Sequence, residues 1–205
     1  MLERLRNVSV GGLLIGLVLM FPQAAMAESA SAVVKPFQDT LLGVMKKADQ
    51  TTILERYEQL APWVEKTFHL SLMAQIATGK HWGRSTKDEK SAVAAAFRRM
   101  SIATLATLFN GYSGEVFAIT GEKPGPSKTT VVMTELRKTD KSIVSIAYVA
   151  RETRGTWRLI DAVVDGGISE LKVRRSEYHL ILKNNGMDGL AKLLNSKADE
   201  LTSKP

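Results

Sequence analysis

The chain has 205 residues, of which 44% are apolar, and it carries a formal net charge of +7. It contains no cysteine, which excludes disulfides, thiol chemistry and thiolate metal sites, so packing and hydrogen bonds must supply its stability. The length fits one domain or two small lobes that share a core. The positive charge favours contact with anionic lipid headgroups or an acidic partner.

The first 27 residues have the pattern of a secretory signal peptide. Two arginines within the first six residues precede a mostly apolar run over residues 8–21, which is shorter than the about 20 apolar residues that cross a bilayer. Ala25-Met26-Ala27 follows, the small-x-small pattern that signal peptidase reads. We therefore expect residues 1–27 to be cleaved and residues 28–205 to form a single soluble periplasmic domain, for which nucleic acid is not an expected partner. A retained N-terminal anchor is the alternative.

The first half of the mature chain has the apolar spacing of helices. Apolar residues recur every three or four positions, which predicts one helical face in each of three segments. These segments are residues 33–45, 52–60 and 68–80. Thr86 and Glu89 have the spacing of a capping box and open a longer helix that runs to about residue 110. Its many alanines widen the apolar stripe, so we expect protein to cover this helix on more than one side.

From about residue 114 the pattern changes to that of strands. Four segments rich in Val, Ile, Thr and aromatic residues are separated by short turns, which predicts an antiparallel meander. The segments are residues 115–120, 129–138, 142–151 and 156–165. The helical spacing then returns over about residues 168–201, with a glycine stop at Gly186. We therefore predict an α+β fold in which a helical layer covers a four-stranded, curved antiparallel sheet.

The third predicted strand has no polar face. It reads I-V-S-I-A-Y-V-A over residues 143–150, so an antiparallel sheet containing it must be covered on both faces or must line a cavity. Small residues, including Ser145 and Ala147, point one way, and bulkier ones, including Ile146 and Tyr148, point the other. The small face leaves room that something must fill, and the simpler interpretation is a helix that packs closely there. A bound ligand is the other interpretation.

The sequence contains no recognisable catalytic constellation. It has no G-x-S-x-G turn and no phosphate-binding glycine loop, and its three histidines lack the spacing of zinc ligands. Asp161 and Asp165 lie on one strand face about 13 Å apart, which is long even for an inverting glycosidase. Asp161 alone is either a pocket acid or a carboxylate bonded to turn amides or to Arg. We expect no enzyme activity, no metal and no cofactor.

Two stretches of the mature chain carry motifs in a definite order. The first contains Met73-Ala74-Gln75 and then Gly79-Lys80-His81-Trp82-Gly83-Arg84-Ser85-Thr86. The second begins with Trp157-Arg158-Leu159-Ile160-Asp161 and ends with Asn185-Gly186-Met187-Asp188-Gly189-Leu190. Together they resemble the MlaC, or toluene-tolerance, family of periplasmic lipid-binding proteins that assist ABC transporters, and the order of elements agrees across nearly the whole mature chain. Val173-Arg174 replaces an Asn-Tyr pair and His69 replaces an Asp, and these differences are closer to the hopanoid-associated branch of the family, called HpnM.

The resemblance implies a carrier that encloses a phospholipid or hopanoid in a hydrophobic pocket between sheet and helices. It also implies that the carrier shuttles this lipid between an inner-membrane ABC transporter or exporter complex and an outer-membrane complex. An envelope enzyme using Asp161 with Tyr148 or Tyr112, and a ligand-free interaction module, are the alternatives. We expect a monomer. The predicted lipid-binding residues are Met73, Ile76, Phe97, Met100, Leu108, Tyr112, Met133, Ile143, Ser145, Ala147, Val149, Ile160 and Ala162. The predicted partner-docking residues are Lys172, Arg174, Arg175 and Lys183.

Overall fold

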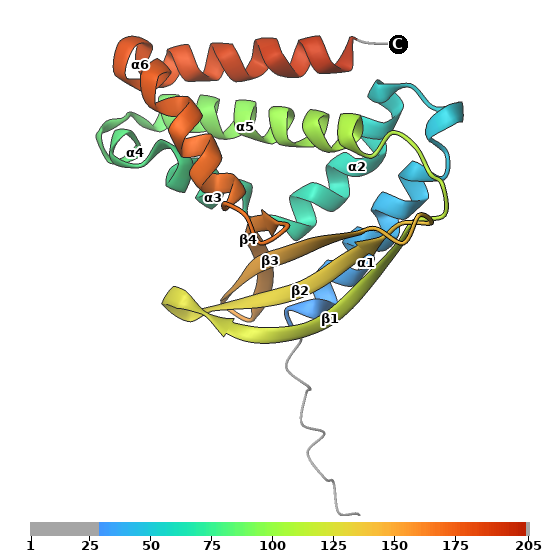
Figure 1. Ribbon diagram of the computed structural model, residues 1–205. Helices are drawn as coiled ribbons and strands as arrows, with labels where there is room; N and C mark the ends of the chain where they lie inside the picture. Colours follow the sequence, from blue (N-terminus) through green and yellow to red (C-terminus); the bar gives the residue numbers. More distant parts are fainter. Residues whose placement is uncertain (1–28, 204–205) are drawn as a thin grey trace, which may run out of the picture.

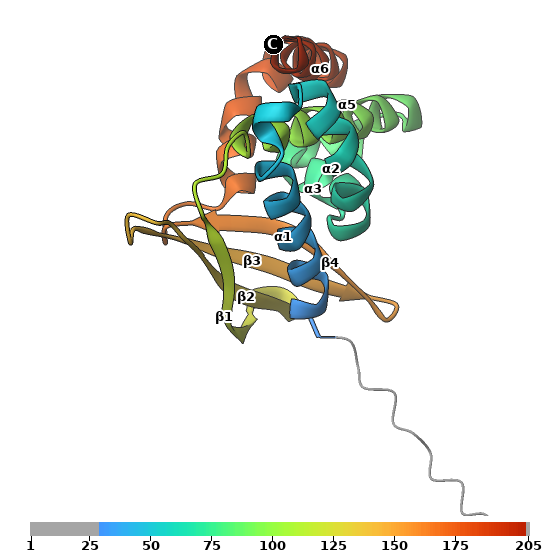
Figure 2. The ribbon, with the colours of Figure 1, turned by 90° about the vertical axis from the view of Figure 1, so that its right-hand side faces the viewer.

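A curved antiparallel sheet lies on one side of the molecule and a layer of helices lies on the other (Figure 1, Figure 2). The computed structural model describes residues 29–203, so the predicted signal peptide lies outside the described residues. The elements in chain order are α1 (Ser31–Met45), η1 (Ala48–Gln50), α2 (Ile53–Thr67), α3 (Leu70–Thr78), α4 (Lys80–Arg84), α5 (Lys87–Leu108), β1 (Val116–Gly125), η2 (Pro126–Lys128), β2 (Thr129–Arg137), β3 (Ile143–Thr153), β4 (Thr156–Val164) and α6 (Glu170–Thr202). The order of helices, strands and helices confirms the predicted α+β class.

The sheet is a simple meander with strand order β1-β2-β3-β4, and every neighbouring pair is antiparallel. The predicted first strand ended at Thr120, whereas β1 continues to Gly125. A register shift between Ile119 and Gly121 allows this continuation, because a bulge absorbs the extra residue and the pairing with β2 then resumes. The turn that the glycines and prolines predicted is therefore shorter than expected.

Local capping explains where the helices begin. The predicted capping box of α5 is present: Glu89 N–H donates to Thr86 Oγ1 at 3.2 Å, and Thr86 N–H donates to the Glu89 carboxylate at 2.7 Å. α2 begins with a second capping box, between Thr52 and Glu55. At the start of α3 the Nδ1 atom of His69 accepts the Leu72 N–H at 3.4 Å. His69 therefore has the acceptor role that an Asp commonly has at this helix position.

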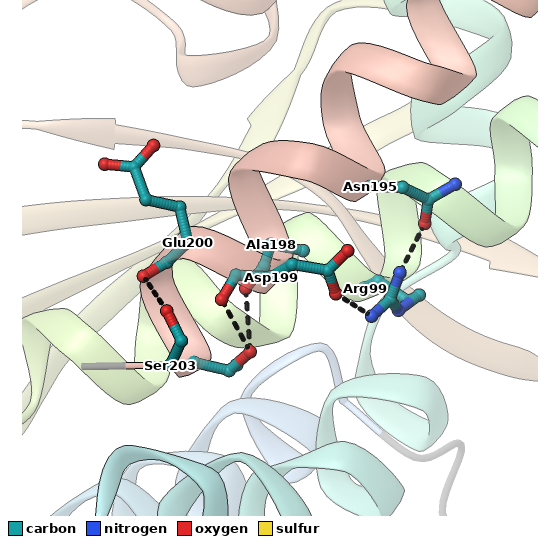
Figure 3. Close-up of polar contacts among 7 residues, drawn as sticks. Arg99, Asn195, Ala198, Asp199, Glu200 and Ser203 are labelled. Carbon is teal, nitrogen blue, oxygen red and sulfur yellow. Dashed lines mark hydrogen bonds and ion pairs between the residues drawn. The ribbon is translucent and has the colours of Figure 1, made fainter. Parts of the chain in front are cut away.

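The last helix is bent. Gly186 has φ 66° and ψ −163° inside α6, a conformation that side-chain-bearing residues rarely adopt. The first arm rises from the sheet and the second arm runs along α5, which agrees with the two helices predicted on either side of Gly186 (Figure 1). Arg99 of α5 holds the second arm against α5, because its guanidinium donates to Asn195 Oδ1 at 2.7 Å and to Asp199 Oδ1 at 2.6 Å (Figure 3).

Two hydrophobic clusters form the interior. The first joins α1, α2 and the end of α5 to the inner face of the sheet, and it includes Phe37 and Tyr148. The second lies within the helical layer among α3, α5 and α6, and it includes Phe97. Phe68, between α2 and α3, and Leu70, the first residue of α3, pack against both clusters. Within residues 29–203 no helix combines the length and apolarity needed to cross a membrane.

Candidate functional site

A cavity of about 240 Å³ lies where the two hydrophobic clusters meet. Its inner end is closed by Phe37, Leu41 and Val64, whose exposed fractions are at most 1%. Phe37 is held by an edge-to-face contact with Phe68 at 5.1 Å and a second with Tyr148 at 6.4 Å. The inner end is therefore a packed apolar wall that joins helix α1 to the sheet.

The other end of the cavity opens where α5 and β4 end and α6 begins. Two apolar side chains at this end are exposed: Leu108 by 67% and Val164 by 38%. Glu170 and Arg174, both on the first turns of α6, complete the opening. Exposed apolar groups beside charged ones mark this end as the entrance, which we call the mouth.

One face of α5 supplies much of the wall. The lining positions on this helix are Phe97, Ser101, Thr104, Leu105 and Leu108, whose three- and four-residue spacing keeps them on one side. Thr104 is satisfied within the helix, because its hydroxyl donates to Met100 O at 2.8 Å. A polar group in this wall therefore does not require water in the cavity.

Four of the predicted lipid-binding residues lie in the wall of this cavity: Met73, Phe97, Leu108 and Ala162. The other nine do not line it. They are Ile76, Met100, Tyr112, Met133, Ile143, Ser145, Ala147, Val149 and Ile160. Ile76 and Met100 pack against the helical cluster, and Ile160 is buried at the register shift between β3 and β4. Tyr112 is 41% exposed, with Lys46 Nζ 5.3 Å from its ring centroid.

The predicted face of β3 is wrong. Ile146 and Tyr148 line the cavity, whereas Ser145 and Ala147 point to the opposite face. Ala147 pairs with Met133 of β2, which places these two predicted residues together on that outer face. The prediction assumed that short side chains create the room. The room comes instead from the separation between sheet and helices, and the large residues facing it bury more apolar area.

Several wall residues were missed from the sequence, including Phe37, Leu41 and Tyr148. The spacing of the first helix did place Phe37 and Leu41 on its apolar face. Spacing identifies a buried face, but it does not distinguish the part that packs fully from the part that borders a gap. No sequence signal separated these residues from ordinary core positions.

The comparisons with known proteins agree with this architecture. Residues 35–196 match the family model described as MlaC protein. The chain belongs to the MlaC family. A solved structure of a phospholipid-binding protein from Ralstonia solanacearum, in complex with a phospholipid, matches with a TM-score of 0.74 and 17% sequence identity. The match covers 84% of this MlaC-family chain and 98% of that chain, and it shows a shared fold.

The possible acid–base pair of this MlaC-family chain does not converge. Tyr148 pairs with Ala162, whereas Asp161 pairs with Val149 and so points to the outer face. Asp161 accepts the N–H groups of Ala162 at 2.8 Å and Leu171 at 3.1 Å, and it also accepts the Ser169 hydroxyl. It is therefore the amide-bonded carboxylate of the two sequence-based alternatives. Burial raises the pKa of Tyr148 to about 12, so its phenol stays neutral at physiological pH.

The predicted docking residues do not form one group. Lys172, Arg175 and Lys183 are exposed and share one face of α6 with His179, because they follow one another at three- and four-residue spacing. We call these four residues the basic face. Arg174 instead lines the mouth, where its Nη1 lies 3.5 Å from Glu177 Oε2.

The basic face borders a second hollow, lined also by Lys80 and His81 of α4. Gly79 lies there with φ +56°, a backbone conformation that favours glycine, and a Cβ atom at this position would lie 3.2 Å from Arg175 Nη2. The lack of a side chain at Gly79 leaves room for the Arg175 guanidinium close to the backbone. Among residues 29–203 no group of three or more His, Asp or Glu side chains is arranged to hold a metal ion.

Proposed function

We propose that this chain is a periplasmic carrier that encloses a membrane lipid in the cavity and moves it between an inner-membrane and an outer-membrane complex. The observation that carries this proposal is the cavity itself, which is apolar, closed at its inner end by buried residues and open at the mouth. Membership of the MlaC family supports binding and transport over catalysis, and it supports a periplasmic location after removal of residues 1–27.

The energetics of lipid transfer favour an enclosing cavity. Each buried methylene is worth about 0.8 kcal/mol, so two chains of about 15 methylenes represent on the order of 24 kcal/mol. A shallow groove could not compete with a bilayer for such a molecule. The cavity volume of about 240 Å³ lies below the roughly 300–1,000 Å³ of ordinary ligand pockets, so a two-chain lipid requires the walls to move apart.

The boundary between the two hydrophobic clusters is where the walls can separate. The cluster in the helical layer and the cluster on the sheet each have their own buried residues, and the cavity lies between them. Separation along this boundary would leave both clusters packed. Phe68 and Leu70, which contact both, would then move relative to one of them.

Both lipid classes named by the family resemblance fit an apolar cavity. The Ralstonia protein of the same fold binds a phospholipid, which supports that class for this chain. The sequence differences at Val173-Arg174 and His69 support the hopanoid class. We propose that the carrier works as a monomer and that its membrane partners, including an ABC transporter, supply the energy for loading and release.

The direct test is to purify the mature chain, extract its lipids and identify them by mass spectrometry. We expect a membrane lipid in near-stoichiometric amount. The delipidated protein should regain lipid from vesicles made of total bacterial lipid. A protein that carries no lipid and takes none from such vesicles would not be a carrier.

The basic face is proposed to steer docking to acidic surfaces of the membrane partners. Reversing two of its charges, with Lys172→Glu and Lys183→Glu, should slow association with the purified inner-membrane complex and weaken its salt dependence. The matched control reverses two exposed lysines elsewhere, with Lys47→Glu and Lys123→Glu. Equal association rates for the two double variants would mean that the basic face is a solvated surface and does not steer docking.

A further inference from the structure

Two charged side chains lie at the mouth of the cavity, although apolar walls alone would bind lipid tails. Of the residues that line the cavity, Glu170 and Arg174 are the charged ones. They are four positions apart on α6, so their Cβ atoms lie on one side of the helix about 5–6 Å apart. A lipid whose tails fill the cavity leaves its head beside these two side chains.

The Arg174 guanidinium is largely available to a ligand. Its side chain is 25% exposed, and the 3.5 Å separation from Glu177 is long compared with the about 2.7–2.9 Å of a charge-assisted hydrogen bond. A guanidinium has five N–H donors in a planar fork that matches a phosphate group. Arg174 therefore offers donors for a phosphate at the mouth.

Two carboxylates near Arg174 disfavour a lipid head that carries a net negative charge. Glu170 makes no ion pair and no side-chain hydrogen bond with any of residues 29–203. Glu177 lies on the other side of Arg174, so the three side chains carry one positive and two negative charges. A head that is only anionic would be attracted by one group and repelled by two. A phosphate that carries an ammonium a few atoms away would satisfy Arg174 and Glu170 together.

We infer that the mouth selects lipids whose head combines a phosphate with an ammonium group, such as phosphatidylethanolamine. Arg174 binds the phosphate and Glu170 binds the ammonium. The inference rests on the proposed carrier function and narrows its ligand to zwitterionic phospholipids, in preference to anionic phospholipids and to hopanoids without charge. The Glu170 and Glu177 carboxylates repel the negatively charged head of an anionic phospholipid and so disfavour its binding.

The test offers delipidated protein three lipids that differ in their head groups. Vesicles of phosphatidylethanolamine, phosphatidylglycerol and the uncharged hopanoid diploptene in equal amounts are incubated with the protein, which is re-isolated for lipid analysis by mass spectrometry. We expect phosphatidylethanolamine to exceed phosphatidylglycerol by about fivefold, the ratio for one partly exposed ion pair worth about 1 kcal/mol. Diploptene should be the least abundant.

Three variants assign the roles. Glu170→Gln should bring the two phospholipids to near equality, because the ammonium group loses its partner while the phosphate keeps Arg174. Arg174→Gln should lower the uptake of both phospholipids relative to diploptene, whereas Arg84→Gln, at an exposed arginine of α4 that does not line the cavity, should leave the wild-type ratio.

Equal uptake of both phospholipids by the wild type, a ratio unaffected by Glu170→Gln, or a preference for diploptene would overturn head selection while lipid carriage stands. Absence of uptake of all three lipids would overturn the carrier function as well.

Discussion

The two faces of strand β3 have the same apolar character in sequence and different environments in the structure. On the inner face Ile146 is 9% exposed and Tyr148 is 4% exposed, and both line the cavity. On the outer face Ile143 is 52% exposed and Ser145 is also exposed. Among residues 29–203 the helices lie on one side of the sheet (Figure 2). A cavity in this fold is thus bordered by large residues that pack at its edge, and small residues do not mark the ligand side.

The largest expected effect is a difference in the free energy of unfolding between substitutions on the two faces of β3. Ile146→Ala should lower the free energy of unfolding by about 2–5 kcal/mol, because it removes buried methyl groups next to an existing gap. Ile143→Ala is the matched control, the same change on the same strand at an exposed position, and it should stay within about 0.5–1 kcal/mol. Urea unfolding of the two variants measures both values. Equal losses would mean that the faces are not distinguished by burial.

A smaller effect tests what the outer face of β4 contributes. Asp161→Ala should lower the free energy of unfolding by about 1–3 kcal/mol, because the Leu171 N–H and the Ser169 hydroxyl lose their acceptor. Asp140→Ala is the control, since this carboxylate accepts from Ser142 within an exposed turn. If both changes cost the same, Asp161 does not tie β4 to the start of α6. The lipid content of Asp161→Ala should remain that of the wild type.

Sequence patterns predicted the layers better than the site. The alternation of β-branched residues and the turn signals gave the four strands, and the capping box at Thr86 gave the start of α5. These features are local, so neighbouring residues determine them. The cavity is not local, because its wall combines α1, α2, α3, α5, α6 and two strands. No spacing within one segment specifies how far the layers lie apart.

The error on β3 has the same origin. Alternation separated Ser145 and Ala147 correctly from Ile146 and Tyr148, but both faces were apolar enough to be the inner one. Pairing with β2 decides the matter, since Tyr148 lies opposite the fully buried Val132 and Ala147 lies opposite Met133. The register between strands is set by tertiary packing as well as by sequence. Arg174 was likewise assigned to docking, because the charge of a residue does not reveal which face of its helix borders the cavity.

The smallest expected effect concerns the edge where α3 meets β4. Burial and the nearby Arg158 and Arg151 lower the pKa of His69 below its usual value of about 6.5. The unfolded chain therefore binds more protons as the pH falls through about 6.5, so the folded state should lose stability there, by less than about 1 kcal/mol. His69→Asn keeps a helix-capping acceptor and should remove this loss. Thermal melts at pH 7.5 and pH 5 compare the two proteins. An unchanged pH dependence in the variant would assign the effect to another group.

The most direct measurement of the central claim compares one substitution on the two faces. Ala162 lies in the cavity wall and Ala147 lies on the outer face, so Ala162→Trp places an indole in the cavity and Ala147→Trp places it outside. Lipid occupancy by mass spectrometry and the melting temperature are measured for both variants. We predict that Ala162→Trp folds and loses most of its lipid, whereas Ala147→Trp retains the lipid of the wild type. Loss of lipid from Ala147→Trp together with full retention by Ala162→Trp would contradict the account and place the lipid on the opposite face of the sheet.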